Sequence, residues 1–310
     1  MSYRPELLAT AATLEELARL MEAGADAFLI GESKYGTRLA GQFTPEMIKE
    51  AVAIAKPKGV RIYAAVNNIM DNASLDDLPG YIGLLREAGV DAIVFGDPAV
   101  LMTAKAEAPG LALHWNAEMT STNYMTAEYW ARRGATRFVL ARELNMEQIE
   151  DTKAKSSMEI QVQVHGMTNI YHSKRSLVNN YLDHQGDSGR IENVDQNRGL
   201  YMMEAERPGE RFPIFEDANG THIMSSDDIC MLESLHELMA IGVESFKVEG
   251  IMKSIEYNEA VVKAYRNAID AYTADPDEYE FQEEWLDAIR ELQDVKRELS
   301  FGFFYKEQVY

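Results

Sequence analysis

The chain has 310 residues, of which 46% are hydrophobic and 26% are charged, so it can bury a sizeable core. This composition excludes a disordered, collagen-like or disulfide-stapled protein, and the length suits a single α/β barrel. The formal net charge of −21 argues against binding to nucleic acid or to an anionic membrane through bulk electrostatics, although a local basic patch or a basic partner leaves such contact open.

Eight short apolar segments alternate with helical patterns along the chain. Several of these segments lie in repeated phrases such as GADAFLIGE, GVDAIVFGD and GVESFKVEG, in which a glycine ends a helix and a buried strand begins. The predicted strands cover residues 6–10, 27–31, 61–66, 92–96, 111–116, 137–141, 159–164 and 245–248. Eight such units predict a TIM-like (β/α)8 barrel, with an open doubly wound sheet as the alternative.

Two stretches depart from this alternation. The long connection between the seventh and eighth strands predicts an insertion at about 167–224 over the C-terminal face of the barrel, followed by a helix at 226–241. The tail at 275–310 is acidic, and its residues 283–299 predict an amphipathic helix. We therefore expect a barrel over 1–274, which includes the insertion, and an acidic helical tail packed on that barrel.

Motifs for hydrolysis, zinc and dinucleotide binding are absent from the sequence. It contains no GxSxG, HExxH or GxGxxG, and the one cysteine, Cys230, is predicted to be a buried residue of the helix at 226–241. One cysteine excludes an intramolecular disulfide and a thiolate-held cluster built from this chain alone. No apolar run reaches the roughly 18 residues of a membrane span, so we expect a cytoplasmic protein without a membrane anchor.

Polar residues follow most of the predicted strands, and in a barrel such residues converge on one pocket. They are Glu32, Asn67, Asn68, Asp97, Glu118, Arg142, Glu143, His165, Lys247 and Glu249. Asp97 is predicted to cap a helix, and Lys247 is more often a counter-ion than a Schiff base. His165 can serve as acid, base or ligand near neutral pH, but a structural, hydrogen-bonded histidine is the alternative.

The inserted segment also alternates cations with aromatic residues. Arg175 and Arg198 lie in the same stretch as Tyr171, Tyr181 and Tyr201. Cations beside aromatic rings can meet phosphates and stacked bases, while nearby acids offset the charge and fit a solvated lid equally well. Composition therefore leaves nucleic-acid contact as the lesser interpretation.

Several phrases occur in the order and spacing of a known family. They are LARELNMEQI, VQVHGM, NRG at 197–199, SSDDICML and KVEGIMKSIEYNEAVVKAYRNAID. With the opening ELLATAATLEELARLMEAGADAFLIGESKYGTR, they make the chain resemble peptidase family U32, the collagenase-like proteins. The resemblance implies a TIM-like barrel. Some members of this family are described as proteases, whereas others take part in prephenate-dependent hydroxylation of the wobble uridine of tRNA, which gives 5-hydroxyuridine.

The RNA-acting members that this chain resembles carry four cysteines in the insertion, consistent with an iron–sulfur cluster. The corresponding positions here are Asn169, Ser176, Tyr201 and Ala205. Amide, hydroxyl and methyl groups cannot replace thiolates around iron. We therefore expect no cofactor bound by this chain, with prephenate as a co-substrate. Ile251 also stands where many relatives have an arginine, which weakens an anion site there.

The resemblance implies the short, cluster-lacking type of tRNA hydroxylation protein, which works with a longer cysteine-bearing paralogue and meets tRNA in that complex. It assigns catalytic roles to His165, Glu143 and Glu249. It assigns substrate binding to Glu32, Arg38, Glu118, Arg142, Arg175, Asn197, Arg198 and Lys247. A collagenase-like hydrolase and a non-catalytic scaffold are the alternative functions, and a homo-oligomer stays open.

Overall fold

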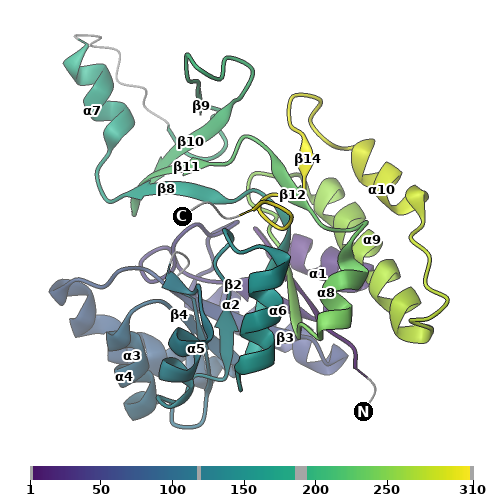
Figure 1. The fold of residues 1–310 in the computed structure, drawn as a ribbon. Helices are drawn as coiled ribbons and strands as arrows, with labels where there is room; N and C mark the ends of the chain where they lie inside the picture. Colours follow the sequence, from purple (N-terminus) through teal and green to yellow (C-terminus); the bar gives the residue numbers. More distant parts are fainter. Residues whose placement is uncertain (1–2, 117–119, 186–193, 308–310) are drawn as a thin grey trace.

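Eight parallel strands close into a barrel in a computed structural model that describes residues 3–116, 120–185 and 194–307 (Figure 1). These strands are β1 (Glu6–Thr10), β2 (Ala27–Ile30), β3 (Arg61–Val66), β4 (Ala92–Phe95), β5 (Ala112–Trp115), β6 (Arg137–Val139), β7 (Glu159–Gly166) and β13 (Ser245–Val248). The barrel closes because β13 pairs in parallel with both β1 and β7. The predicted TIM-like barrel is confirmed.

Helices surround the barrel and connect its strands. They are α1 (Leu14–Ala23), α2 (Pro45–Ala55) with the short 3-10 helix η1 (Lys56–Lys58), α3 (Asn72–Ala88), α4 (Pro98–Glu107), α5 (Tyr124–Ala131), α6 (Met146–Lys155), α8 (Leu235–Ile241) and α9 (Ile255–Ala274). The side chains of Thr44 and Asp97 cap α2 and α4, and a proline occupies the first helical position of both. No helix in the described ranges is long and apolar enough to cross a membrane.

Alternate residues of each strand face either the barrel interior or the helices. Large outward residues such as Phe28, Phe138 and Phe246 form the main core with the helices. At the N-terminal end of the interior, Glu6 is buried and is paired with Arg137 at 2.5 Å. Ser245 and Tyr63 also donate hydrogen bonds to Glu6. This network closes that end of the barrel, so the opening lies at the other end.

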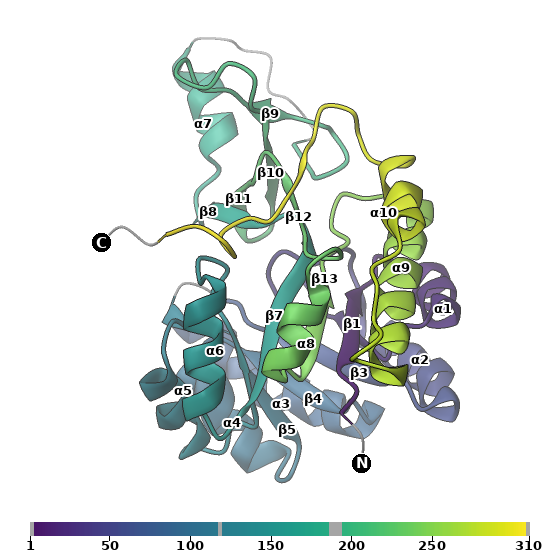
Figure 2. The same ribbon diagram turned by 45° about the vertical axis from the view of Figure 1, so that its right-hand side comes forward.

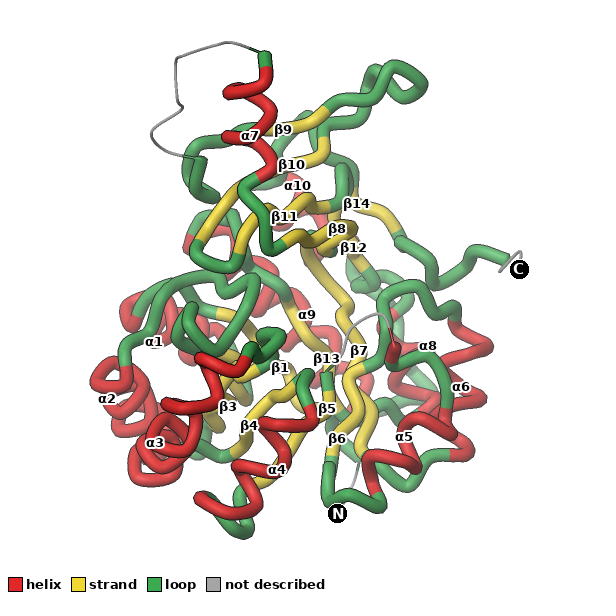
Figure 3. Tube along the Cα trace, turned by 90° about the vertical axis from the view of Figure 1, so that its left-hand side faces the viewer, coloured by secondary structure: helices red, strands yellow, loops and turns green. Residues whose placement is uncertain are grey.

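The insertion forms a separate four-stranded sheet over the opposite end of the barrel (Figure 3). Its strands are, in sheet order, β8 (Asn169–Ser173), β11 (Gly220–Met224), β10 (Phe212–Asp217) and β9 (Tyr201–Met202), and α7 (Leu177–His184) follows β8. Asn219, in the β10–β11 turn, donates to the carbonyls of Ser33 and Gly36 and accepts from Asn68. These bonds fasten the insertion to the loops after β2 and β3.

The segment after the insertion differs from its prediction. A helix was expected over 226–241, but residues Asp228–Cys230 form β12, and only α8 is helical. The placement of Cys230 in a helix is therefore wrong. β12 pairs antiparallel with β7 at Gly166 and His165, so the end of β7 supplies ladder partners that a local hydrophobic pattern cannot reveal.

The predicted tail helix at 283–299 is also wrong in its second half. α10 (Glu283–Arg290) ends early, and residues Leu299–Ser300 form β14, which pairs in parallel with β12. Figure 2 shows the tail packed along α9 and then crossing beneath the insertion. Gln293 and Arg297 turn inward to Asp228, and these tertiary bonds replace further helical turns.

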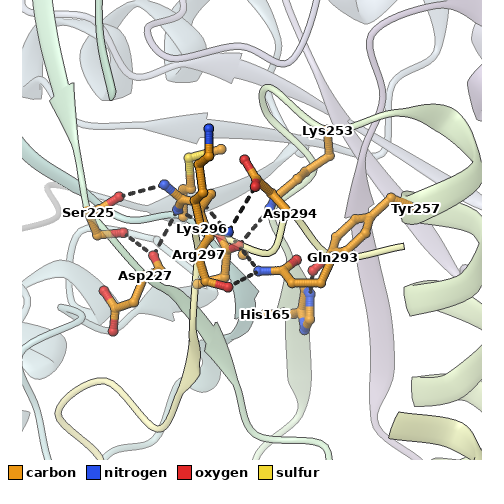
Figure 4. A network of polar contacts seen from close by, with 12 residues as sticks. His165, Ser225, Asp227, Lys253, Tyr257, Gln293, Asp294, Lys296 and Arg297 are labelled. Carbon is orange, nitrogen blue, oxygen red and sulfur yellow. Dashed lines mark hydrogen bonds and ion pairs between the residues drawn. The ribbon is translucent and has the colours of Figure 1, made fainter. Parts of the chain in front are cut away.

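Asp228 is the centre of a buried polar network that joins β12, the loop after β13 and the tail. Figure 4 shows its partners Lys253, Gln293 and Arg297. Its carboxylate is fully buried and pairs with Lys253 at 2.6 Å and with Arg297 at 2.8 Å. Arg297 also donates to the backbone carbonyls of Ser225 and Asp227. Burial opposes ionisation of Asp228, but the bonds from Arg297 and the charge of Lys253 hold its pKa well below the usual value.

Candidate functional site

A pocket lies at the barrel mouth between the C-terminal strand ends and the insertion. Its polar lining comprises Thr10, Thr37, Arg38, Asn67, Asn116, Arg142, Gln163, Asn169, Lys247 and Glu249. The insertion and the loop after β13 contribute Met167, Met224 and Ile251. Three cations therefore face one carboxylate in a chain whose net charge is −21. Such a lining favours a small anion with an apolar portion.

Lys247 and Glu249 form an ion pair on one wall of the pocket. The Lys247 ammonium lies 2.7 Å from Oε2 of Glu249, which is 7% exposed. The other oxygen of Glu249 accepts from the Thr10 hydroxyl at 3.0 Å and from the Ile251 backbone N–H at 3.2 Å. Glu249 is thus rigidly held, and it fixes the direction of the Lys247 ammonium.

Gly166 explains how the ends of β7 and β13 come so close. Its φ is +96°, and a Cβ at this position would lie 2.1 Å from the carbonyl oxygen of Glu249. The Glu249 N–H donates to the His165 carbonyl at 3.0 Å. Only glycine fits this left-handed position against the neighbouring backbone. Gly166, which follows His165 in the sequence, therefore has a structural role in shaping the pocket.

Arg142 and Asn169 meet on the opposite wall. The Arg142 guanidinium donates to the backbone carbonyl of Asn169, which ties the loop after β6 to the first residue of the insertion sheet. The Asn169 side chain is buried, and its amide oxygen has no hydrogen-bond partner in the described structure. A buried acceptor that lines a pocket without a partner is suited to a donor on a ligand.

His165 lies outside this pocket. The register between β7 and β13 shifts so that Gln163 is opposite Lys247 while His165 is opposite Val248, which leaves an additional residue in β7. The shift turns His165 towards α9, where it is fully buried and its Nε2 lies 2.9 Å from the Tyr257 hydroxyl. Burial lowers the pKa of His165 to about 3. This position gives no support to the predicted catalytic role and fits the structural alternative.

The structure brings together only some of the other predicted site residues. Arg38, Arg142, Lys247 and Glu249 line the pocket, whereas Glu143 is exposed and lines an adjoining groove. Glu32 is half-buried outside the lining, and burial raises its pKa. Arg175, Asn197 and Arg198 are exposed on the insertion and are not among the lining residues. Glu118 lies outside the described residues.

Four pocket residues were missed as site candidates by the sequence analysis: Thr10, Thr37, Asn116 and Gln163. Gln163 alternates with the outward-facing Val162 and Val164 of β7, and a polar residue between buried apolar ones is the signal that could have identified it. Thr37 lies in a loop, and no periodicity marks it.

The residues at the four family cysteine positions do not fit an iron–sulfur cluster. Asn169 is on β8 and Tyr201 on β9, the two edges of the insertion sheet, so three strand spacings of about 4.8 Å separate them. None of the four is a thiolate ligand, and Cys230 is buried with its pKa raised by burial. In the part of the chain that is described, no group of three or more His, Cys, Asp or Glu side chains could hold a metal.

Comparisons with known proteins agree with the fold and with the sequence motifs. A family model described as Peptidase family U32 matches residues 12–309. The chain is 49% identical to tRNA hydroxylation protein P2 of Bacillus subtilis over 99% of both chains. It is 34% identical to tRNA hydroxylation protein P1 of the same organism, over 100% of this chain and 74% of that one.

Solved structures support the same assignment at the level of fold. The U32 peptidase Mk0906 gives a TM-score of 0.51 at 16% identity, over 80% of this chain and 94% of that protein. Dihydrodipicolinate synthase DapA-2 from Bacillus anthracis also gives 0.51, at 12% identity, over 94% of this chain and 83% of that protein. With a family model that matches almost the whole chain, the protein belongs to peptidase family U32.

Proposed function

We propose that this chain is a component of tRNA hydroxylation, in the prephenate-dependent formation of 5-hydroxyuridine at the wobble position. The observation that carries the proposal is the 49% identity over 99% of both chains to a protein named tRNA hydroxylation protein P2. Relatives with related names recur at lower identity, including tRNA hydroxylation protein P of Escherichia coli at 31%.

The lining of the pocket at the barrel mouth supports the proposal that the chain binds a small acidic co-substrate. Prephenate carries one carboxylate on its ring and a second on a pyruvyl side chain, and the pocket offers three cations beside apolar groups. Lys247, held by Glu249, would pair with one carboxylate, and Arg142 would bind the other. Asn169 would accept a hydrogen bond from the ligand's hydroxyl through its unpartnered oxygen. In this proposal the chain binds and orients the acid.

The redox step is assigned to a partner. The residues at the family cysteine positions cannot hold a cluster, so no step through such a group is derived for this chain. Bacillus subtilis has both a P1 and a P2 protein, and this chain matches 74% of the P1 length. This supports a longer, cysteine-bearing paralogue as the partner, with tRNA bound in their complex.

The hydrolase alternative has no particular observation in its favour. Among the described residues, no serine, cysteine or histidine lines the mouth pocket. A nucleophile with a hydrogen-bonded base is the minimum for covalent hydrolysis, and His165 and Cys230 both lie buried outside this lining.

Nucleoside mass spectrometry of bulk tRNA tests the proposal. The gene is deleted in its own host, in a background that lacks any parallel oxygen-dependent hydroxylation route, and is then restored on a plasmid. The proposal predicts that 5-hydroxyuridine and its derivatives disappear on deletion and return with the wild-type gene. Unchanged levels after deletion would refute it, and assays of the purified chain on gelatin or casein would follow.

A further inference from the structure

A second concave surface adjoins the mouth pocket, between the insertion and the C-terminal tail. We call it the tail groove. Its charged and aromatic lining comprises Arg142, Glu143, Arg207, Glu210, Arg211, Phe212, Asp227, Lys296, Glu298, Phe303 and Lys306. Arg142 and Asn169 line both this groove and the pocket, so the two spaces adjoin at these side chains. Figure 2 shows the tail passing between the insertion and α6, and tail residues from Lys296 to Lys306 are part of the groove lining.

Three cations of the tail groove lack a carboxylate partner. In the described ranges, Arg211, Lys296 and Lys306 take part in no ion pair, in contrast to Arg207, which pairs with Glu204 and Glu210. Two of the acids in the lining are already engaged. Glu210 accepts from Ser226 in addition to its pair with Arg207, and Asp227 accepts from Ser300. The lining as a whole holds five cations and four acids, so its net charge is slightly positive in a chain that is strongly acidic.

Aromatic rings accompany two of these cations. Arg211 lies 4.6 Å from the ring centroid of Tyr201, and Lys306 lies 4.7 Å from that of Phe303. Tyr201, which lies beside the lining residue Arg211, is 45% exposed and Phe303 is 42% exposed, so both rings are partly accessible. Ile170, at 51% exposed, adds an apolar contact in the same groove. Cations that track phosphates beside rings on which bases stack are the usual means of binding single-stranded nucleic acid.

The geometry points to the tail groove as the binding track for the single-stranded nucleotides that flank the reacting base. This inference rests on the proposed function. A base inside a hairpin loop must leave its stack before it can react, and the groove adjoins the pocket at Arg142. Tyr201 and Phe303 stack the neighbouring bases, while Arg211, Lys296 and Lys306 pair with their phosphates. The excess of cations over acids in its lining, in a chain whose net charge is −21, is the reason that we assign the groove to this polyanion.

Fluorescence anisotropy with a labelled anticodon stem-loop RNA that carries uridine at the wobble position tests the groove. The wild-type chain, alone and with its longer paralogue, is compared with the double variant Arg211→Glu/Lys306→Glu. The matched control is Lys49→Glu/Lys263→Glu, which makes the same charge change at exposed positions of α2 and α9. We expect the groove variant to bind at least about tenfold more weakly and the control to bind within about twofold of wild type.

The salt dependence provides a second readout. Each lost phosphate contact on a single strand lowers the slope of log affinity against log salt by about 0.7, so the groove variant should lower it by about 1.4. Equal affinity of the groove variant and the control would overturn the inference, as would a wild-type chain that does not bind the RNA in either form. Loss of co-purification with the paralogue, with RNA binding unchanged, would identify the groove as a protein-docking surface instead.

The two proposals fail in distinguishable ways. If deletion of the gene removes 5-hydroxyuridine but Arg211→Glu/Lys306→Glu restores it fully, the groove inference fails and the proposed function stands. If deletion leaves the nucleoside unchanged, the proposed function itself fails. Circular dichroism and thermal unfolding of the double variant should match wild type, since both side chains lie on the surface of the groove.

Discussion

The substitution Asp228→Asn should destabilise the protein through the buried network that anchors the tail. The wild-type carboxylate is fully buried and accepts hydrogen bonds from Lys253 at 2.6 Å, Arg297 at 2.8 Å and Gln293 at 2.7 Å. An asparagine keeps one acceptor oxygen but turns an NH2 group towards a donor. It also leaves two buried cations without a countercharge. Breaking a buried pair in this way costs about 3–5 kcal/mol, which corresponds to a fall in Tm of about 5–8 °C for a chain of 310 residues.

Urea denaturation at pH 7 measures this loss, with Asp277→Asn as an exposed control for the same chemical change. The control should change the free energy of unfolding by less than about 0.5 kcal/mol. Because the pKa of Asp228 is lowered in the folded state, its contribution is complete above the unfolded pKa near 3.9 and declines below it. The difference in stability between the variant and wild type should therefore begin to narrow below about pH 4 and shrink further as the pH falls towards the lowered folded pKa. A loss below about 1 kcal/mol at pH 7 would refute the reasoning.

Three further predictions concern His165, Gly166 and Asn219. Since the folded pKa of His165 is about 3, the unfolded chain takes up its proton first, and stability should fall by about 1.4 kcal/mol per pH unit below pH 6.5. His165→Phe should lose this slope in urea titrations at pH 5 and 6.5, and an unchanged slope would contradict the buried neutral imidazole. Gly166→Ala should cost about 2–4 kcal/mol against about 1 kcal/mol for Gly110→Ala, which has a similar φ of +88° but open space; equal losses would disprove the close approach to Glu249. Asn219→Ala should speed tryptic cleavage of the insertion several-fold with a smaller fall in Tm, and unaltered cleavage would mean that the turn does not fasten the insertion.

The barrel strands could be predicted from the sequence because their signals are local. Before β2, β4 and β13 a glycine ends the preceding helix, a short turn follows, and a strand of four largely buried residues comes next. The inserted sheet could be located by the length of its connection, although its strands could not be traced.

The errors concern features that depend on distant partners. β12 forms because the end of β7 needs a neighbour, and the tail leaves its helix because Asp228 attracts Gln293 and Arg297. His165 continues the alternation of polar residues in β7 whose side chains point into the barrel. Only the additional residue in β7 turns the His165 side chain outward. A register shift of this kind has no signature in a single sequence.

The candidate site, like the fold, could be predicted only in part from the sequence. Lys247, Glu249 and Arg142 follow their strands directly, so the rule that strand ends converge was sufficient to place them in the pocket. Arg198 and Arg175 were carried over from the family resemblance, and their place on a separate sheet could not be inferred from strand ends.

Under the proposed function, the cationic mouth pocket serves tRNA hydroxylation. The most direct test is nucleoside mass spectrometry of tRNA from the deletion strain complemented with Lys247→Met/Glu249→Gln, which removes both members of the ion pair and leaves no unpaired charge. Wild type and the exposed-site variant Asp277→Asn serve as controls, and immunoblots confirm equal protein levels. We expect both controls to restore 5-hydroxyuridine and the pocket variant not to restore it. Full restoration by the pocket variant would contradict it.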